Sequence, residues 1–458
     1  MDIASTLVRE AFFPLWAWWD GDGELPRHRH AYAQLDTQGP AQVREAQLQG
    51  LRSMLRHAHS NTPFYRERLD RCGLDPEQFS GLADLRRLPL LGKAEIRDAG
   101  DALIARNIPA ADLLPASTGG STGRPLRFYR DRQAVHRRKA QEWYFDRWMG
   151  HSLGEKAALF VAASHYQGAG GRLKGRLRNA TCERLLRFDP ARTDEPSMEA
   201  FARAYRRFRP AVIKCFPNAL WVFAEFVRRR GIQLPPVRAI SCTGENLYPH
   251  QRELFQELFG GEVFEKYGTK EAGVIACESA AHDGLYVFSP GVLVEVLRED
   301  GEPAAPGEMG RVVITDLFNR GMPLLRYDIG DMAVAGPLEP PAGGPPLPVL
   351  QRLLGRDRDI LQDEAGRPRP GYLFVEVINR LNLGAQFQII QSAPDRVRVK
   401  YVPDRDEPPE LAPLAQAYRE LLGPGVALEF QRVTALPRDP SGKYRYVVSE
   451  IPPRPRAA

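Results

Sequence analysis

Cysteine is scarce in this sequence, and the few cysteines are scattered. Five occur among 458 residues, and no two stand in a Cys-x-x-Cys spacing. We therefore expect neither a disulfide framework nor a paired-thiol metal site. Low cysteine use is typical of a protein kept in a reducing compartment, so we expect a cytoplasmic location.

Long apolar runs are also missing. The most apolar stretch, residues 12–19, is far shorter than the roughly 20 residues that a membrane-spanning helix needs. Acidic Asp2 and Glu10 lie at the start of the sequence, so we do not expect a secretory leader. We expect no membrane span, and we favour packing of residues 12–19 on the main domain over a place on a membrane or partner surface.

A compact basic block is absent as well. The net charge is +6, but the arginines are spread along the chain without interleaved aromatic residues, so we expect no nucleic-acid partner. The positive balance suits an anionic substrate. One local cluster alternates with Leu or Gly, and a solvated face is favoured there over an anchor for the phosphates of a second substrate: Arg172, Lys174, Arg176 and Arg178.

What the sequence does contain is a glycine-rich stretch at residues 117–125, whose first seven residues are all Ser, Thr or Gly. Such small side chains let backbone N–H groups and hydroxyls surround phosphate oxygens. A flexible linker is the ordinary alternative. The stretch is short, ends in Arg124-Pro125 and leads into an expected strand at 126–129, which favours a phosphate-holding loop. No Lys-Ser or Lys-Thr follows the last glycine, so a kinase or GTPase P-loop is not supported.

Helical and strand patterns alternate through the first 357 residues. Their order predicts a β-α-β-α-β unit with parallel strands. The carboxyl ends of parallel strands lie at the same edge of a sheet, so the polar turns 243–245 and 267–271 should lie together there. We expect the glycine-rich loop to reach the same edge. The expected helices are 42–59, 132–149, 199–208, 218–229 capped by Asn218, and 249–259; the expected strands are 157–163, 211–216, 237–242, 263–266, 285–288, 292–297 and 311–315.

A charged turn at residues 355–359 follows a proline-rich loop and predicts a boundary. Two domains also fit the length of the chain. We therefore expect a large domain over residues 1–357, to which the resemblance described next assigns the binding of ATP and the acid, and a small domain over residues 358–458. In the small domain we expect strands 386–391, 397–402 and 427–433 and a helix at 411–422.

Five ordered motifs resemble those of the adenylate-forming superfamily, in the phenylacetate–CoA ligase-like branch with its capsule-biosynthesis relatives. The resemblance spans about residues 48–451. It implies an α/β fold with parallel sheets and helices in the large domain and a small, mobile α+β domain after it. The motifs are STGGSTGRP at 117–125, TGE at 243–245, YGTKE at 267–271, RYDIGD at 326–331 with GRDRD at 355–359, and PRDPSGK at 437–443.

The resemblance also assigns roles. It implies that Glu271 binds Mg²⁺, that Lys443 is the catalytic lysine of the small domain, and that Arg358 is the hinge between the domains. Asp331 would hold the ribose, Tyr267 would stack on the adenine, and Arg356 would contact ribose or phosphate. The remaining expected ATP-binding residues are Ser117, Thr118, Gly119, Gly120, Ser121, Thr122, Gly123, Gly244, Glu245, Gly268, Thr269 and Lys270.

Two features depart from the family pattern, one single residue and one metal site. Lys270 stands where relatives usually have Thr or Ser. A zinc site that some relatives build from one Cys and two His falls here on Ser279, His282 and Tyr286, so zinc is not expected. Cys277 is displaced by two residues and could in principle compensate.

The resemblance implies an AMP-forming acid–thiol ligase that uses ATP and Mg²⁺, with CoA as the favoured acceptor. A carrier-protein thiol or an amine is the alternative acceptor, and a homodimer is left open. The alternative to an enzyme is a catalytically inactive nucleotide-binding protein, and Lys270 is the one residue that favours it. The sequence does not identify the acid. Candidate pocket residues are His165, Tyr166, Phe216, Pro217 and Asn218.

Overall fold

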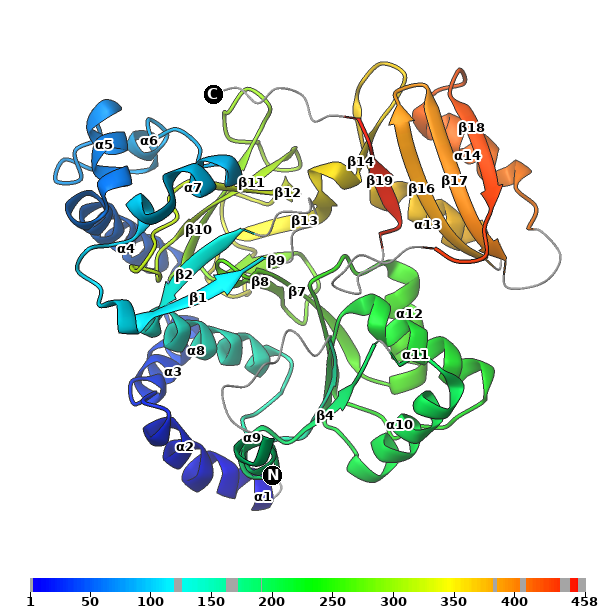
Figure 1. Cartoon of the computed structure of the whole chain (residues 1–458), viewed down its shortest axis with the longest axis horizontal. Helices are drawn as coiled ribbons and strands as arrows, with labels where there is room; N and C mark the ends of the chain where they lie inside the picture. The colour runs from blue at the N-terminus through cyan, green and yellow to red at the C-terminus, as the bar shows by residue number, and fades with distance from the viewer. Residues whose placement is uncertain are drawn as a thin grey trace.

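The computed structural model describes residues 3–118, 126–161, 172–190, 192–381, 385–403, 409–436 and 445–451. Its described part is an α/β fold built as two units. A large unit holds an eleven-stranded sheet, and a smaller one, coloured orange to red in Figure 1, holds a four-stranded sheet. None of the described helices is long and apolar enough to cross a membrane.

One half of the large sheet is parallel, as the sequence predicts. Its strands are apolar on both faces because helices connect and cover them. The prediction that Asn218 caps the second helix is wrong, since the cap is Phe216 and Pro217 begins the helix. In order across the sheet lie β4 (Leu185–Phe188), β3 (Ala157–Phe160), β5 (Val212–Cys215), β6 (Ala239–Thr243) and β7 (Glu262–Thr269), with α10 (Glu195–Phe208), α11 (Pro217–Arg229) and α12 (Pro249–Phe259).

The other half of the sheet is antiparallel, so the sheet is mixed rather than purely parallel. Strand β7 pairs in parallel with β6 and antiparallel with β8. Because β8 extends the ladder, residues 267–269 belong to a strand and not to the turn that we expected. Beyond β7 follow β8 (Gly273–Glu278), β9 (Leu285–Val287), β13 (Val349–Arg356), β12 (Tyr327–Ala335), β11 (Met309–Asp316) and β10 (Val292–Leu297).

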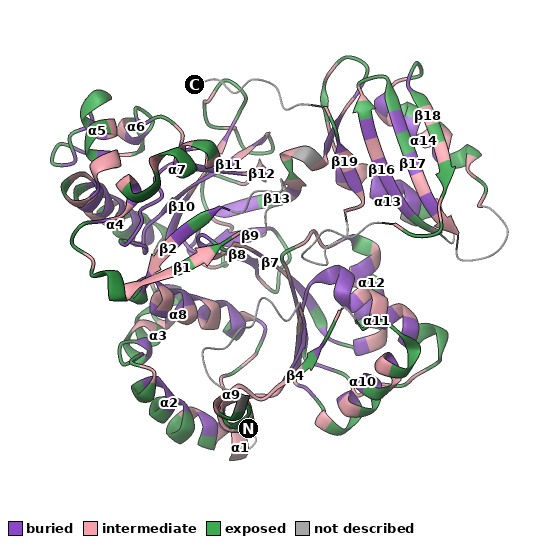
Figure 2. Cartoon of the chain, in the orientation of Figure 1, coloured by how far each residue is buried: buried purple, intermediate pink, exposed green. Residues whose placement is uncertain are grey.

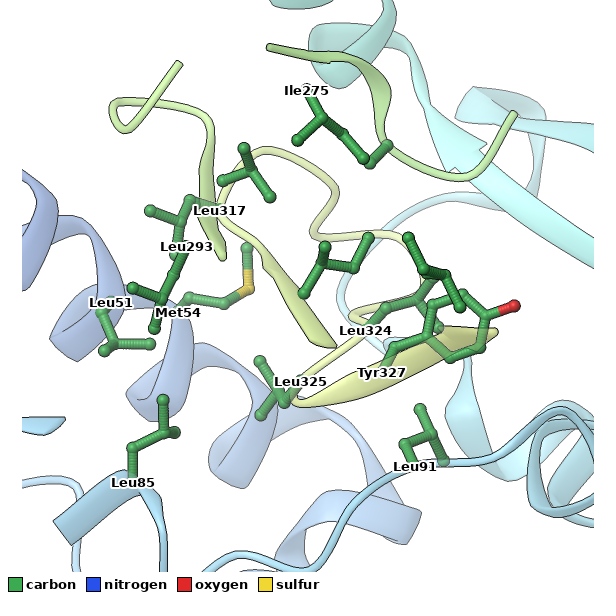
Figure 3. Packing of buried hydrophobic residues seen from close by; sticks show 14 of the residues in the cluster. Leu51, Met54, Leu85, Leu91, Ile275, Leu293, Leu317, Leu324, Leu325 and Tyr327 are labelled. Atoms are coloured by element: carbon green, nitrogen blue, oxygen red, sulfur yellow. The ribbon is translucent and has the colours of Figure 1, made fainter. Parts of the chain in front are cut away.

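Helices of the first hundred residues cover the antiparallel half. Figure 3 shows Leu51 and Met54 of α4 packed with Leu85, Leu325 and their neighbours, all of them buried. This apolar layer fixes α7, and hence Lys93, beside β12. The helices are α4 (Pro40–Asn61), α5 (Pro63–Arg71), α6 (Leu82–Leu85) and α7 (Lys93–Ala99).

The hairpin β1 (Leu113–Ser117) and β2 (Arg127–Asp131) carries the glycine-rich stretch, and α8 (Arg132–Trp148) follows it directly. Three helices at the start of the chain, α1 (Ile3–Leu7), α2 (Phe13–Trp19) and α3 (Leu25–Ala33), lie near α8 and α9 (Arg172–Arg178) in Figure 1. Phe13 and Trp16 are buried there, whereas Trp18 and Trp19 are exposed. Residues 12–19 therefore pack on the large unit with one face only.

The C-terminal unit has its own hydrophobic core. Buried residues alternate with exposed ones along β17 (Figure 2), as expected for a sheet that packs helices on one face. The predicted strands and α14 are confirmed, whereas α13 and β19 were not predicted. The boundary at residue 358 and the mobility of this unit stay predictions. Its elements are β14 (Ile360–Gln362), β15 (Pro368–Pro370), α13 (Gly371–Leu381), β16 (Ala385–Ala393), β17 (Arg396–Pro403), α14 (Ala412–Leu422), β18 (Ala427–Arg432) and β19 (Val447–Ser449).

A buried ionic cluster joins α8 to the parallel strands. Asp146 accepts hydrogen bonds from Lys214 of β5 at 2.6 Å and from Lys266 of β7 at 2.9 Å. Burial would raise the pKa of Asp146, but Lys214 and Lys266 hold it well below its ordinary value. The cluster therefore ties the helix after the glycine-rich stretch to the strands that carry the two polar motifs.

We predict that Asp146→Asn destabilises the protein, because Lys266 would stay buried without its counter-ion. The expected loss of unfolding free energy is about 3 to 5 kcal/mol, measured by urea denaturation at neutral pH. The control is Asp98→Asn, which changes an exposed carboxylate of α7 and should cost less than about 0.5 kcal/mol. A small effect of both variants would contradict the structural role of the cluster.

The effect of Asp146→Asn should also depend on pH. A carboxyl group whose pKa is lowered in the folded state stabilises it fully above the unfolded-state pKa, and this contribution disappears as the pH falls through the folded-state pKa. The stability difference between wild type and Asp146→Asn should therefore narrow as the pH drops below the ordinary value of 3.8. A difference that widens on acidification would rule out this ionic origin.

Candidate functional site

A cavity of about 770 Å³ opens at the carboxyl ends of β5, β6 and β7, where both units contribute walls. Such ends are where open α/β sheets bind ligands. Ser117 and Pro217 do not line the cavity, and Gly119, Gly120, Ser121, Thr122, Gly123, His165, Tyr166 and Lys443 lie outside the described residues. The cavity brings together Thr118, Phe216, Asn218, Gly244, Glu245, Tyr267, Gly268, Thr269, Lys270, Glu271, Asp331 and Arg356.

Thr118, in the glycine-rich stretch, forms two hydrogen bonds with Leu126, the residue that follows the stretch. Its backbone N–H donates to the carbonyl of Leu126 at 3.0 Å, and its hydroxyl accepts from the N–H of Leu126 at 3.0 Å. Both contacts hold Thr118 and Leu126 side by side at the cavity wall. The described part of the motif thus reaches the same edge as the turns that follow β6 and β7.

The turn after β6 places Gly244 against Phe216. Gly244 has φ of +77°, and a Cβ there would lie 2.6 Å from the Phe216 ring, so both the backbone conformation and the contact require glycine. Glu245 accepts a hydrogen bond from the backbone N–H of Asn218 at 3.1 Å. Residues expected at the adenine and residues expected at the acid therefore share one wall.

The hairpin of β7 and β8 carries the YGTKE motif. A Cβ on Gly268 would lie 2.6 Å from the carbonyl oxygen of Gly273, so glycine permits the close strand approach. Thr269 accepts from the N–H of Ala272 through its hydroxyl at 3.1 Å, which tightens the turn. Lys270 is exposed at the tip, and Glu271 is buried just inside it.

Asp331 and Arg356 are directly opposite each other on β12 and β13. Nε of Arg356 lies 2.8 Å from Oδ1 of Asp331, and the hydroxyl of Tyr267 donates to Oδ2 at 2.7 Å. Burial raises the pKa of Asp331, and the nearby guanidinium group opposes that shift. Three motifs that are far apart in the sequence thus converge on one carboxylate.

Glu271 is the residue best suited to hold a metal ion. One oxygen accepts from the hydroxyl of Tyr327 at 3.0 Å, and the other accepts no hydrogen bond from the described residues. A buried carboxylate with an available oxygen fits Mg²⁺, which binds proteins through one or two carboxylates together with phosphate oxygens. The described residues contain no group of three or more His, Cys, Asp or Glu placed to hold a metal. The absence of zinc stays a prediction.

Sequence reasoning missed several charged residues of the cavity. Lys93 donates to the carbonyl of Ile329 at 2.9 Å, and burial followed by the charge of Arg356 lowers its pKa. Arg138, Lys139 and Lys214 line a separate wall. The i, i+3, i+4, i+7 spacing of Val135, Arg138, Lys139 and Glu142 on α8 could have indicated a shared face, but no pattern places Lys93.

The C-terminal unit reaches the cavity through residues 445–447. Arg445 forms an ion pair with Asp359 at 2.5 Å, and the hydroxyl of Tyr446 lies 3.4 Å from Oδ1 of Asn218. The contact of Tyr446 with Asn218 joins the segment that follows the PRDPSGK motif to the large unit, whereas the Arg445–Asp359 pair joins it to the charged turn at the predicted boundary.

Comparison with known proteins agrees with this architecture. The CapK C-terminal domain family matches residues 372–450. A phenylacetate–coenzyme A ligase of Thermus thermophilus is 28% identical over 65% of this chain and 67% of its own length. Protein CapK of Staphylococcus aureus is 23% identical and covers 89% of both chains.

A solved 2-hydroxyisobutyryl-CoA ligase in its postadenylation state has a TM-score of 0.73, with 20% identity and 92% coverage of both chains. The same ligase in its thioesterification state gives 0.60, with 20% identity and 91% coverage of both chains. The fold is therefore shared, with the higher similarity to the postadenylation arrangement. The chain is a distant homologue of the phenylacetate–CoA ligases and CapK-like proteins, which form one branch of the adenylate-forming superfamily.

Proposed function

We propose that this protein activates a carboxylic acid with ATP, forming an acyl adenylate and releasing pyrophosphate, and then passes the acyl group to a thiol. The observation that carries the proposal is the convergence of Thr118, Gly244, Tyr267, Glu271 and Asp331 on one cavity. These five residues come from four motifs that are far apart in the sequence, and only the fold brings the motifs together.

The chemistry explains why these residue types are needed. The carboxylate and the α-phosphate are both anions, so bringing them together requires nearby positive charge. Bound Mg²⁺ on Glu271 would supply part of that charge. In our proposal the ammonium group of Lys443 supplies the rest, from a position two residues before Arg445, which lines the cavity.

Asp331 would hold the ribose by accepting hydrogen bonds from its two hydroxyls, with Arg356 and Tyr267 fixing the carboxylate in place. Its present partners leave it beside the cavity, 7% exposed. Gly244 and Glu245 would line the adenine, and Thr118 would begin the loop around the phosphates. Ser117, which is outside the cavity wall, would act only through the backbone of that loop.

CoA is the favoured acceptor, with a carrier-protein thiol or an amine as the alternative. A screen of carboxylic acids for ATP-dependent pyrophosphate release, each with CoA, a phosphopantetheinyl carrier or an amine, tests the proposal. We expect release that depends on one class of acid and a thioester that forms with CoA. ATP binding without pyrophosphate release for any acid would favour the inactive nucleotide-binding alternative.

We predict that Lys443→Ala separates the two half-reactions. Acid-dependent ATP–pyrophosphate exchange should fall by about a hundredfold or more, since a positioned cation acts on charge that develops in the transition state. Thioester formation from a supplied acyl adenylate should stay close to the wild-type rate. Lys400→Ala, on β17 of the same unit, is the control, and equal loss of both half-reactions in Lys443→Ala would remove this assignment.

Glu271→Gln and Asp331→Asn should both slow adenylation, but for different reasons. Glu271→Gln weakens a metal ligand, so raising the Mg²⁺ concentration should recover part of the rate. Asp331→Asn weakens a contact to the ribose, so it should raise the KM for ATP and remain insensitive to Mg²⁺. Steady-state rates over a Mg²⁺ titration distinguish them, and identical responses would contradict the two roles.

The hinge prediction at Arg358 concerns the second half-reaction, because the thiol must approach the carbonyl that Lys443 faces in the first. Arg358→Pro fixes φ near −65° and should hold the C-terminal unit in one arrangement. We expect pyrophosphate exchange to survive, while thioester formation falls by at least about tenfold, or about 1.4 kcal/mol of barrier. Arg358→Ala keeps the backbone free and serves as the control. Thioester formation at the wild-type rate in the proline variant would place the hinge elsewhere.

A further inference from the structure

The cavity has a wall to which none of the nucleotide motifs contributes. Helix α8 supplies Val135, Arg138, Lys139 and Glu142, whose spacing puts them on one helix face. Leu159 of β3 lines the same cavity. With the nucleotide placed at Tyr267 and Asp331 as proposed above, this wall is the part left for the acid, and the inference below rests on that proposal.

The lysines of this wall are neutralised by neighbouring carboxylates. Lys214 donates to Asp146 at 2.6 Å and lies 3.5 Å from Glu142. Lys139 forms an ion pair with Asp22. These ion pairs neutralise both lysines without a ligand, so the lysines do not by themselves indicate what the cavity binds.

Arg138 is different because its side chain is only partly satisfied. The residue is 8% exposed, and Nη2 forms an ion pair with Asp316, but Nε and Nη1 have no hydrogen-bond partner in the described part of the chain. Its stem lies under Gly273, where a Cβ would be 3.1 Å from Cδ of Arg138. Arg138 therefore lines the cavity as a buried guanidinium group with two donors that have no partner among the described residues.

Arg130 of β2 adds a second guanidinium group to the same wall. It forms no ion pair within the described ranges, and its Nε is buried without a partner. Both arginines line the cavity, and burial followed by the charge of Arg138 lowers the pKa of Arg130. Among the described residues, one buried and one half-buried guanidinium group therefore have a single paired carboxylate, Asp316, and it belongs to Arg138.

We propose that Arg130 and Arg138 form an anion-binding subsite for a second acidic group on the substrate, so that the activated acid is a dicarboxylic acid or carries an equivalent charge. A guanidinium group presents its N–H donors in a planar fork that matches a carboxylate. Val135 and Leu159 on the same wall suit the carbon body of an acid better than they suit pyrophosphate. On the nucleotide side, Lys93 and Arg97 already supply cations beside Thr118.

The test compares matched acids that differ only in the second carboxylate: succinate with butyrate, glutarate with valerate, and isophthalate with benzoate. Pyrophosphate release is measured with wild type, Arg130→Gln and, as a control on the opposite face of β2, Arg127→Gln. We expect wild type and Arg127→Gln to prefer at least one diacid. Arg130→Gln should lower kcat/KM for that diacid by about tenfold to a hundredfold, as expected for a lost charge-assisted hydrogen bond, and leave its monoacid partner unchanged.

Three results would overturn the subsite. One is a preference for monoacids that Arg130→Gln does not alter. Another is an equal loss for both members of a pair, which would assign the arginines to the reacting carboxylate. The third is a raised KM for ATP or weaker inhibition by pyrophosphate with unchanged acid preference, which would assign them to phosphate. Arg138→Gln is a less suitable variant, because it also breaks the buried pair with Asp316.

Calorimetric binding of the diacids without ATP separates this inference from the proposed function. Suppose that no acid supports pyrophosphate release, yet a diacid binds wild type and binds Arg130→Gln about tenfold more weakly. This result would support the anion-binding subsite and contradict the proposed adenylation activity. If pyrophosphate release depends on monoacids and no diacid binds, the result would support the proposed adenylation activity and contradict the anion-binding subsite. Loss of both signals overturns both.

Discussion

The candidate site depends on one strand with two different neighbours. Strand β7 pairs in parallel with β6 and antiparallel with β8. The parallel side brings the β6 turn with Gly244 to the same edge as the end of β7, and the antiparallel side returns the chain so that Glu271 lies just inside it. Tyr267 then reaches Asp331 on β12, at 2.7 Å. Gly268 makes this arrangement possible, since any larger residue would meet the backbone of Gly273.

Two groups of charged side chains in this fold differ in how completely their charges are paired. Asp146 faces two lysines and a histidine, and each of the three pairs with its carboxylate, so the cluster holds α8 on the sheet. Arg130 and Arg138 have a single carboxylate between them and three buried nitrogens without partners. Because buried charges are costly unless paired, an incomplete cluster inside a cavity indicates a missing anion, whereas a complete one indicates structure.

The sequence predicts much of this arrangement, and its errors have physical causes. The β-α-β-α-β order could be predicted because apolar runs alternate with segments of helical spacing. Gly231 and Gly260 mark the ends of the two helices. The extension of β7 through Thr269 was not readable, because its partner β8 comes from the chain beyond the motif. The cap at Phe216 was missed because Pro217 starts the helix one residue before Asn218. Lys93 could not be predicted, since only the packing of α7 beside β12 brings it to the cavity.

The most direct test of the account is to follow the oxygen atoms of the acid. A carboxylate labelled with heavy oxygen is supplied with ATP and the acceptor thiol, and the products are analysed by mass spectrometry. Attack of the carboxylate on the α-phosphate, followed by transfer to the thiol, leaves one labelled oxygen in AMP. The account predicts that label in AMP and none in pyrophosphate. Label in inorganic phosphate with ADP as the product, or ATP cleavage with unlabelled AMP, would contradict it.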